Sequence, residues 1–338
     1  MTTTPVAAPP RERTSALARA TSGIARVRAW CAQHRKLTTV AGTLIAVLVL
    51  VALLNGRRHD FATALSRASL GTLAIAAALQ IVALLARSEA WHLTIGAAGG
   101  TVDRRRLYRA SSMGYVGSLL NSQLGMAARI AALRRSCAVE SPGVSTLIAA
   151  EFPILAVEAG LAALTSFTLV GPLGLPWWVP LIAMAVVGLL TAGLGRLSGR
   201  TARPLWRGLA VLRSLRGGRS LLAFVLVAVF AQILRNWLLL NAVGVPASLF
   251  DAIAVLIAMV VLGQLPIGPS VGAGAVVLIL GHDGVAAAAA AGVLATATGT
   301  VGGLAFAAWA AGDRVWHGRV LRRRGAGGET AVTRAPGW

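Results

Sequence analysis

The amino-acid sequence predicts an all-α, polytopic integral membrane protein: a helical bundle of about six full spans with two broken or re-entrant hairpins. The first observation is composition, since 56% of the residues are hydrophobic, 13% are charged and the mean hydropathy is +0.73. A soluble domain carries about a quarter charged residues. The second is a set of apolar windows near or above the roughly 18 residues that a span requires. The third is a pair of apolar segments that small and polar residues interrupt.

The apolar windows define the membrane domain. At 1.5 Å per residue, a helix of about 18 residues is about 27 Å long, close to the hydrocarbon thickness of a bilayer. The predicted full spans are Leu37–Leu54, Leu70–Leu85, Val144–Val170, Trp177–Leu197, Leu221–Leu240 and Val285–Ala311. We therefore assign residues 37–312 to a transmembrane domain. Residues 1–36 are a basic arm, disordered in part, and residues 313–338 are a basic tail.

The formal net charge of +21 is concentrated outside the apolar windows. Arginines crowd the amino-terminal arm, the segment Arg196–Arg219 and the tail, whereas the connections Gly171–Pro176 and Asn241–Phe250 contain none. Because Lys and Arg favour cytoplasmic loops, we predict a multi-pass protein of the cytoplasmic (inner) membrane with both termini in the cytoplasm. No nucleic-acid recognition motif accompanies the charge, so we expect no nucleic-acid partner.

The two interrupted segments are Gly117–Gly125 and Gly263–Gly274. Irregular backbone at bilayer depth survives only inside protein or beside a wet cavity. A pair of such segments, one in each half of a chain, is the best sequence pointer to a transporter's binding site. Flanking charges predict that the first hairpin enters from the cytoplasm and the second from outside, as in an inverted repeat. Hydropathy leaves open an alternative in which Leu249–Leu265 is a complete span.

Placing a charged side chain inside the membrane costs free energy, so charged residues in the predicted spans are candidates for a functional site. Glu151 and Glu158 are seven residues apart, which returns them to nearly the same face of a helix. We predict that both line a polar cavity, with Arg129 and Arg235 as their partners or as ligands for lipid phosphate. The alternative is structural: salt bridges that only pack the interior, with Arg235 snorkelling to the outer interface.

The interrupted segments supply further candidates. Asn121 and Gln264 either hydrogen-bond a lipid head group or satisfy the opened backbone of the hairpins. Turn-forming and close-packing roles are expected for Gly125, Pro266, Gly268, Pro269, Gly272 and Gly274. The two cysteines and five histidines are scattered without ligand spacing, so we predict no metal, no cofactor and no catalytic residue.

Four short motifs carry a family resemblance. They are Arg87-Ser88-Glu89-Ala90-Trp91, then Tyr115 to Asn121 followed by Gly125 and Arg129, then Glu151, and finally Gln264-Leu265-Pro266-Ile267-Gly268-Pro269 with Gly272 and Gly274. Over roughly residues 35–315 the chain resembles the transmembrane, flippase-like domain of lysylphosphatidylglycerol synthases and its stand-alone relatives. The resemblance implies about eight membrane helices and a role in lipid handling. The chain departs from the family pattern at Phe152, where an arginine is usual, and at Gly274-Ala275-Val276, where an acid is usual.

The resemblance also bears on activity. In the full synthases, aminoacyl transfer belongs to a separate soluble domain, and only residues 313–338 follow the last predicted span here. We therefore expect a non-enzymatic protein that translocates, or assists translocation of, an amphipathic lipid or glycolipid between leaflets, with anionic head groups as its ligands. Two alternatives stay open. One is a membrane-embedded lipid transferase, and the other is a scaffold that holds a cell-envelope or glycosyltransferase complex.

Overall fold

The structure, a computed structural model, describes residues 56–120, 122–136, 142–200, 215–263, 271–281 and 284–328, together with residues 44, 48 and 52. Every regular element in these ranges is a helix, as the sequence predicted. Four stretches are long and apolar enough to cross a membrane: Leu70–Ala97, Val144–Leu173, Gly217–Ala242 and Val285–Trp316. They coincide with four of the predicted spans. The first predicted span, Leu37–Leu54, lies almost entirely outside the described residues.

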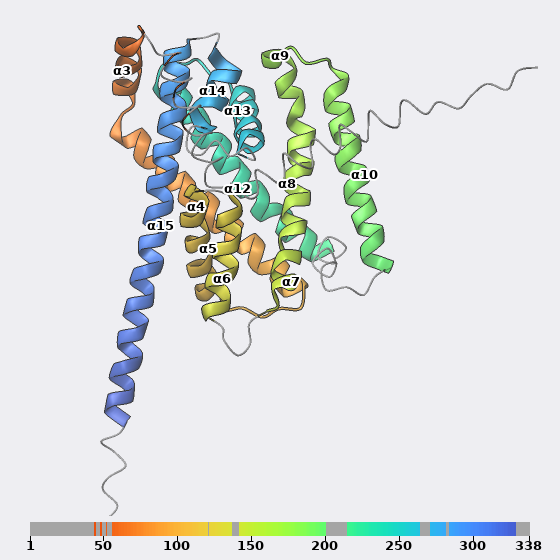
Figure 1. The fold of residues 1–338 in the computed structure, drawn as a ribbon, viewed down its shortest axis with the longest axis vertical. Coiled ribbons are helices and arrows are strands. Elements are labelled where there is room, and N and C mark those ends of the chain that lie inside the picture. The colour runs from red at the N-terminus through yellow and green to blue at the C-terminus, as the bar shows by residue number, and fades with distance from the viewer. Residues whose placement is uncertain are drawn as a thin grey trace, which may run out of the picture.

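The long helices define a bundle with two ends (Figure 1). Helices α4 (Leu70–Ala97), α10 (Trp178–Arg200) and α15 (Val285–Gly328) run one way, while α12 (Leu215–Ala242) and the pair α7 (Val144–Ala149) and α8 (Glu151–Thr165) run the other. The short helices α3 (Arg58–Arg67), η1 (Ser166–Leu169) and α9 (Val170–Leu173) lie at or near one end, which we call the α9 end. The opposite end is the α7 end.

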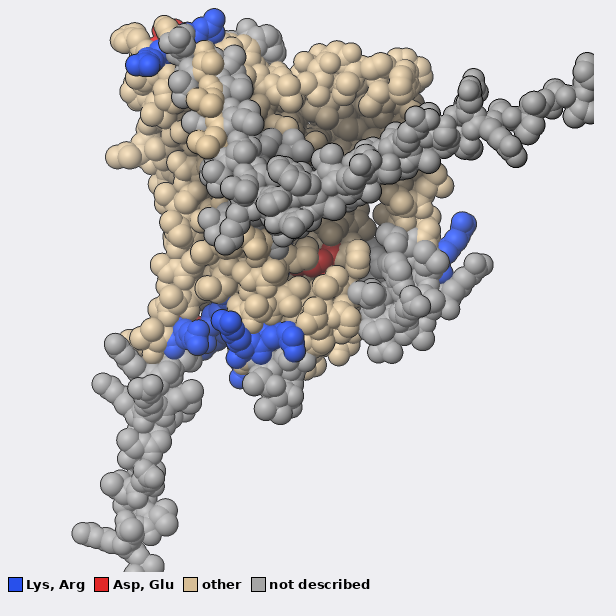
Figure 2. Space-filling model, viewed as in Figure 1, with Lys and Arg blue, Asp and Glu red and all other residues tan. Residues whose placement is uncertain are grey.

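The outer surface of the bundle is apolar. Leu70, Leu189 and Phe250 are 85%, 74% and 70% exposed, values that would be costly in water. In Figure 2 uncharged residues (tan) cover most of the visible face, and Lys and Arg (blue) gather toward the two ends. This distribution is that of a protein whose solvent is lipid in the middle and water at both ends.

Two helical hairpins enter the bundle from opposite ends (Figure 1). Helices α5 (Arg104–Leu120) and α6 (Ser122–Ser136) begin and finish at the α7 end, whereas α13 (Leu249–Leu262) and α14 (Val271–Leu280) begin and finish at the α9 end. The 14-residue α13 is about 21 Å long, shorter than the roughly 30 Å hydrocarbon core. The structure therefore supports the re-entrant interpretation and not a complete span at Leu249–Leu265.

Small residues allow the first hairpin to close. A Cβ atom added to Gly125 would lie 2.7 Å from the carbonyl oxygen of Gly114, and one added to Gly114 would lie 2.7 Å from the Cβ of Arg129. Real Cβ atoms do not approach so closely, so the α5 and α6 backbones are in contact because both positions lack a side chain. This contact also fixes the position of Arg129 on α6.

Each hairpin has its own apolar core. The α13–α14 hairpin packs on α12 and α15, and the buried residues of this core include Leu239, Val243, Val255, Ile279 and Ala291. The core around the α5–α6 hairpin also draws on α4, α7, α8 and α12, and its buried residues include Trp91, Leu107, Leu133, Leu147 and Ile154. Buried polar side chains lie near the inner ends of both hairpins, and they form the candidate site.

Two helices continue beyond the predicted membrane spans. Helix α15 continues through Asp313 to Gly328, beyond the last span predicted to end at Ala311, because the arginines that follow are good helix formers. Helix α10 likewise continues to Arg200, into the basic segment that follows the predicted span Trp177–Leu197. Most of that basic segment, residues 201–214, lies outside the described part of the chain.

Candidate functional site

An ion pair joins the first hairpin to the third predicted span. Arg129 on α6 donates from Nη1 to Oε1 of Glu151 on α8 at 2.8 Å, and the two side chains are 11% and 7% exposed. The guanidinium carbon of Arg129 also lies 3.5 Å from the ring centroid of Trp91 on α4. The aromatic face and the carboxylate together stabilise a charge that burial would otherwise penalise. Sequence analysis predicted Arg129 as a partner of Glu151, and the structure brings them together.

A second ion pair lies beside the first. Glu158, two helical turns along α8, accepts a hydrogen bond from Arg87 on α4. Arg87 and Trp91 are one turn apart on α4, so the two ion pairs lie close together along the facing helices α4 and α8. Unlike the Arg129 pair, this one is open, with 42% of the Arg87 side chain and 25% of the Glu158 side chain exposed. Figure 2 shows acidic surface (red) within the uncharged middle of the molecule.

Arg235 occupies a different environment from that predicted. It is only 6% exposed, so it does not snorkel to an interface, and it contacts neither glutamate of the two ion pairs. Its Nη1 donates to Oε1 of Gln80 on α4, and the same oxygen accepts from Nε2 of Gln232 at 3.0 Å. A cluster of one guanidinium and two carboxamides therefore joins α12 to α4 inside the bundle.

The Arg235 cluster lies near the inner ends of both hairpins. On the side of the first hairpin, Tyr115 of α5 donates its hydroxyl to the carbonyl oxygen of Gly299 on α15 at 2.7 Å. A Cβ added to Gly299 would lie 3.3 Å from Nη1 of Arg235 and 3.7 Å from the Tyr115 hydroxyl oxygen. On the other side, the amide nitrogen of Asn236 lies 3.8 Å from the sulfur of Met259, near the inner end of α13.

Two side-chain contacts hold the first hairpin in place at the α7 end. Arg109 on α5 donates from Nε to Asp313 of α15 at 2.9 Å, and Tyr108 donates to Glu89 of α4. The Tyr108 ring also packs edge-on against Phe306 and Trp309 of α15. These contacts hold α5 between α4 and α15. Sequence analysis did not find them, since their partners are remote along the chain and none stands out by hydropathy.

The remaining predicted residues divide into two groups. Gly125 and Gly272 lie at close helix contacts: a Cβ on Gly272 would be 2.6 Å from the hydroxyl oxygen of Thr296. Gly274 is different, because a Cβ there would meet no atom within 4 Å, and the close-packing role expected for it has no support. Five predicted positions lie outside the described residues: Asn121, Gln264, Pro266, Gly268 and Pro269.

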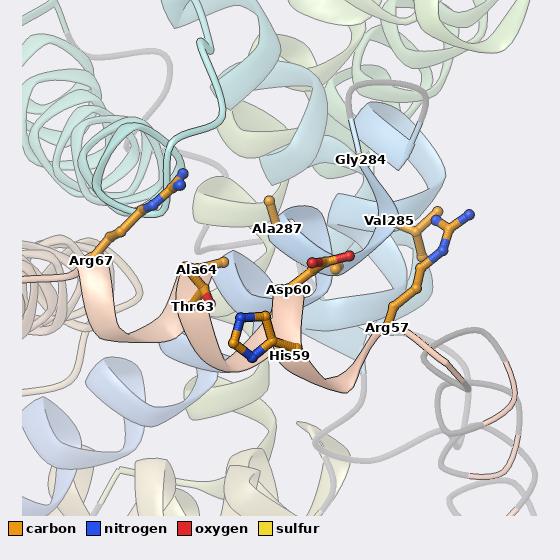
Figure 3. Close-up of a pocket in the computed structure, with 10 residues that line it drawn as sticks. Arg57, His59, Asp60, Thr63, Ala64, Arg67, Gly284, Val285 and Ala287 are labelled. Carbon is orange, nitrogen blue, oxygen red and sulfur yellow. The ribbon is translucent and has the colours of Figure 1, made fainter.

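A surface pocket of about 410 Å³ lies at the α9 end (Figure 3). It is lined by α3 and the start of α15, including Arg57, His59 and Asp60. Figure 3 shows His59 and Asp60 on α3 together with Val285 and Ala287 at the start of α15. None of the lining residues belongs to the buried ion pairs or to the Arg235 cluster, which lie on α4, α6, α8 and α12.

The fold and the buried charges define a class of protein: a multi-pass helical membrane protein with two opposed helical hairpins and buried ionisable residues. The comparison with protein families gives the particular family. The model for the lysylphosphatidylglycerol synthase TM region matches residues 39–308, and the chain belongs to this family. The family implies a membrane protein that acts in lipid-related processes. No curated protein matches the chain in sequence.

Proposed function

We propose that the protein translocates, or assists translocation of, an amphipathic lipid or glycolipid between the leaflets of the cell membrane. The observation that carries this proposal is the approach of two opposed hairpins to the buried polar residues Arg235, Gln80 and Tyr115. Sites of this kind, between broken segments near the bilayer midplane, are where transporters bind their cargo. Membership of a lipid-handling membrane family is consistent with a lipid as that cargo.

The two ion pairs provide a route from one end toward this centre. In our proposal the α7 end, with Arg104, Arg134 and Arg135, faces the cytoplasm, as the excess of basic residues there favours. A head group passes between α4 and α8 by exchanging hydrogen bonds first with the Arg129–Glu151 pair and then with the more exposed Arg87–Glu158 pair. The acyl chains remain in lipid along the apolar outer surface.

Reconstitution into liposomes tests the proposal. Vesicles that contain a fluorescent phospholipid are treated with a membrane-impermeant quencher, which reaches only the outer leaflet. The protein is expected to make the inner-leaflet label reachable as well, while protein-free vesicles retain it. An unchanged protected fraction would contradict the proposal. In that case, recovery of partner proteins would indicate the scaffold alternative, and a covalently altered lipid would indicate the transferase alternative.

A further inference from the structure

Arg235 is a buried cation outside all the ion pairs of the described residues. Those pairs use Arg87, Arg104, Arg109 and Arg129. The Nε atom of Arg235 is buried and has no hydrogen-bond partner among the described residues, and the same holds for the Oδ1 atom of the adjacent Asn236. An isolated charge inside a protein costs several kcal/mol, which a counter-ion normally offsets.

The described part of the chain does not supply that counter-ion. The sequence has 11 Asp and Glu residues. Four of them, Glu89, Glu151, Glu158 and Asp313, pair with the other arginines. Three lie at helix starts, Asp60, Asp103 and Asp251, and four lie outside the described residues, Glu12, Glu140, Asp283 and Glu329. The segment 264–270, which joins α13 to α14, contains no acidic residue.

The groups around Arg235 are rich in hydrogen-bond donors. A guanidinium has five N–H donors and a carboxamide has two. The side-chain oxygen of Gln80 already accepts hydrogen bonds from both Arg235 and Gln232. The cluster therefore has more N–H donors than acceptor atoms. The Tyr115 hydroxyl lies nearby, since a Cβ on Gly299 would approach both it and Arg235, and it would reach a ligand by giving up its hydrogen bond to the Gly299 carbonyl oxygen. One positive charge with several converging donors suits an oxyanion, and a guanidinium binds phosphate oxygens in a bidentate manner.

We infer that Arg235, Gln80 and Tyr115 form a binding site for a single phosphate group near the inner ends of the two hairpins. With the proposed function, on which this step rests, the phosphate is that of a phospholipid head group in transit, held between α4 and α12. The site accounts for the one buried arginine without a carboxylate partner in the described structure, and it makes the cargo a phospholipid and not an uncharged glycolipid.

Binding to the purified protein tests this site separately from translocation. Delipidated protein in detergent is titrated with phosphatidylglycerol, with a glucosyl diacylglycerol of the same acyl chains, or with inorganic phosphate, and bound adducts are counted by native mass spectrometry. Arg235→Gln is expected to weaken phosphatidylglycerol binding by about 10- to 100-fold, as loss of a charge-assisted hydrogen bond predicts. Arg219→Gln, an exposed arginine of the same helix, serves as the matched control and is expected to bind as the unaltered protein does.

The ligands distinguish the two sources of phosphate. Arg235-dependent binding of phosphatidylglycerol but not of the glycolipid supports a lipid phosphate, and equal Arg235-dependent binding of inorganic phosphate supports a free anion at the same site. Equal binding of phosphatidylglycerol by Arg235→Gln and the unaltered protein would overturn the inference. If Arg235→Gln does not fold, Arg235→Lys retains the charge without the planar fork, and unchanged affinity in that variant would overturn it as well. Normal binding without lipid movement would instead refute only the proposed translocation.

Discussion

Replacing Glu151 by glutamine is expected to reduce lipid movement in proteoliposomes by at least about tenfold, and Arg129→Gln is expected to do the same. Each change removes one partner of a buried charge-assisted hydrogen bond of 2.8 Å. In our proposal a passing head group exchanges partners with this pair, so a neutral side chain lowers its affinity for the route. The measurement is the rate at which the inner-leaflet fluorescent lipid becomes reachable by the quencher, normalised to folded protein.

The double variant separates transport from folding. Removal of one partner leaves an unpaired buried charge and destabilises a protein by about 3–5 kcal/mol, whereas removal of both leaves none. Glu151→Gln combined with Arg129→Gln is therefore expected to recover most of the folded protein but not lipid movement. Full lipid movement in the double variant would show that the pair only packs the interior. The exposed Arg219→Gln again provides the matched control.

Straightening the second hairpin is expected to reduce lipid movement to the protein-free background. The variant replaces Pro266, Gly268 and Pro269 with alanine, which restores backbone donors and favours one continuous helix from α13 to α14. Gly272 is kept, because a Cβ there would meet Thr296 at 2.6 Å and would damage folding for an unrelated reason. Membrane insertion should be retained, since the apolar length is unchanged. The lipid assay described above measures the effect.

Gly274→Ala is the control for this hairpin. It lies on α14 beside Gly272, but its added Cβ would face open space, so lipid movement should be unaffected. Cysteine accessibility at residue 281 reports whether the hairpin has straightened, because a continuous helix carries that end across the bilayer. A straightened hairpin with normal lipid movement would make the broken segment a packing feature and would remove the main structural support for translocation.

Much of the architecture could be predicted because membrane-spanning segments are recognisable from short stretches of apolar sequence. Four long helices follow directly from apolar length, and the small residues Gly117 and Gly125 marked the first hairpin. The absence of basic residues in Asn241–Phe250 predicted that the second hairpin enters from the opposite side to the first. Each of these signals lies within one short stretch of sequence, so no knowledge of helix packing was required.

The site was predicted only in part because its contacts depend on which helices touch. Glu158 pairs with Arg87, which is 71 residues earlier on α4, and nothing in either local sequence specifies that partner. Gln80 was not predicted at all, since a single glutamine in an apolar span has no distinctive pattern. The depth of Arg235 also depends on packing: α4 buries it, whereas the same sequence on a lipid-facing surface would allow snorkelling.

The most direct test of the central claim is to locate lipid head groups in the protein. A phospholipid with a photoreactive group in its head group is cross-linked to the protein in vesicles, and the labelled peptides are identified by mass. We expect label on the middle of α4 and α12 and on the inner end of α5, around Gln80, Arg235 and Tyr115, and a loss of that label in Arg235→Gln. Label confined to the two ends of the bundle, with the same yield in Arg235→Gln, would contradict the account.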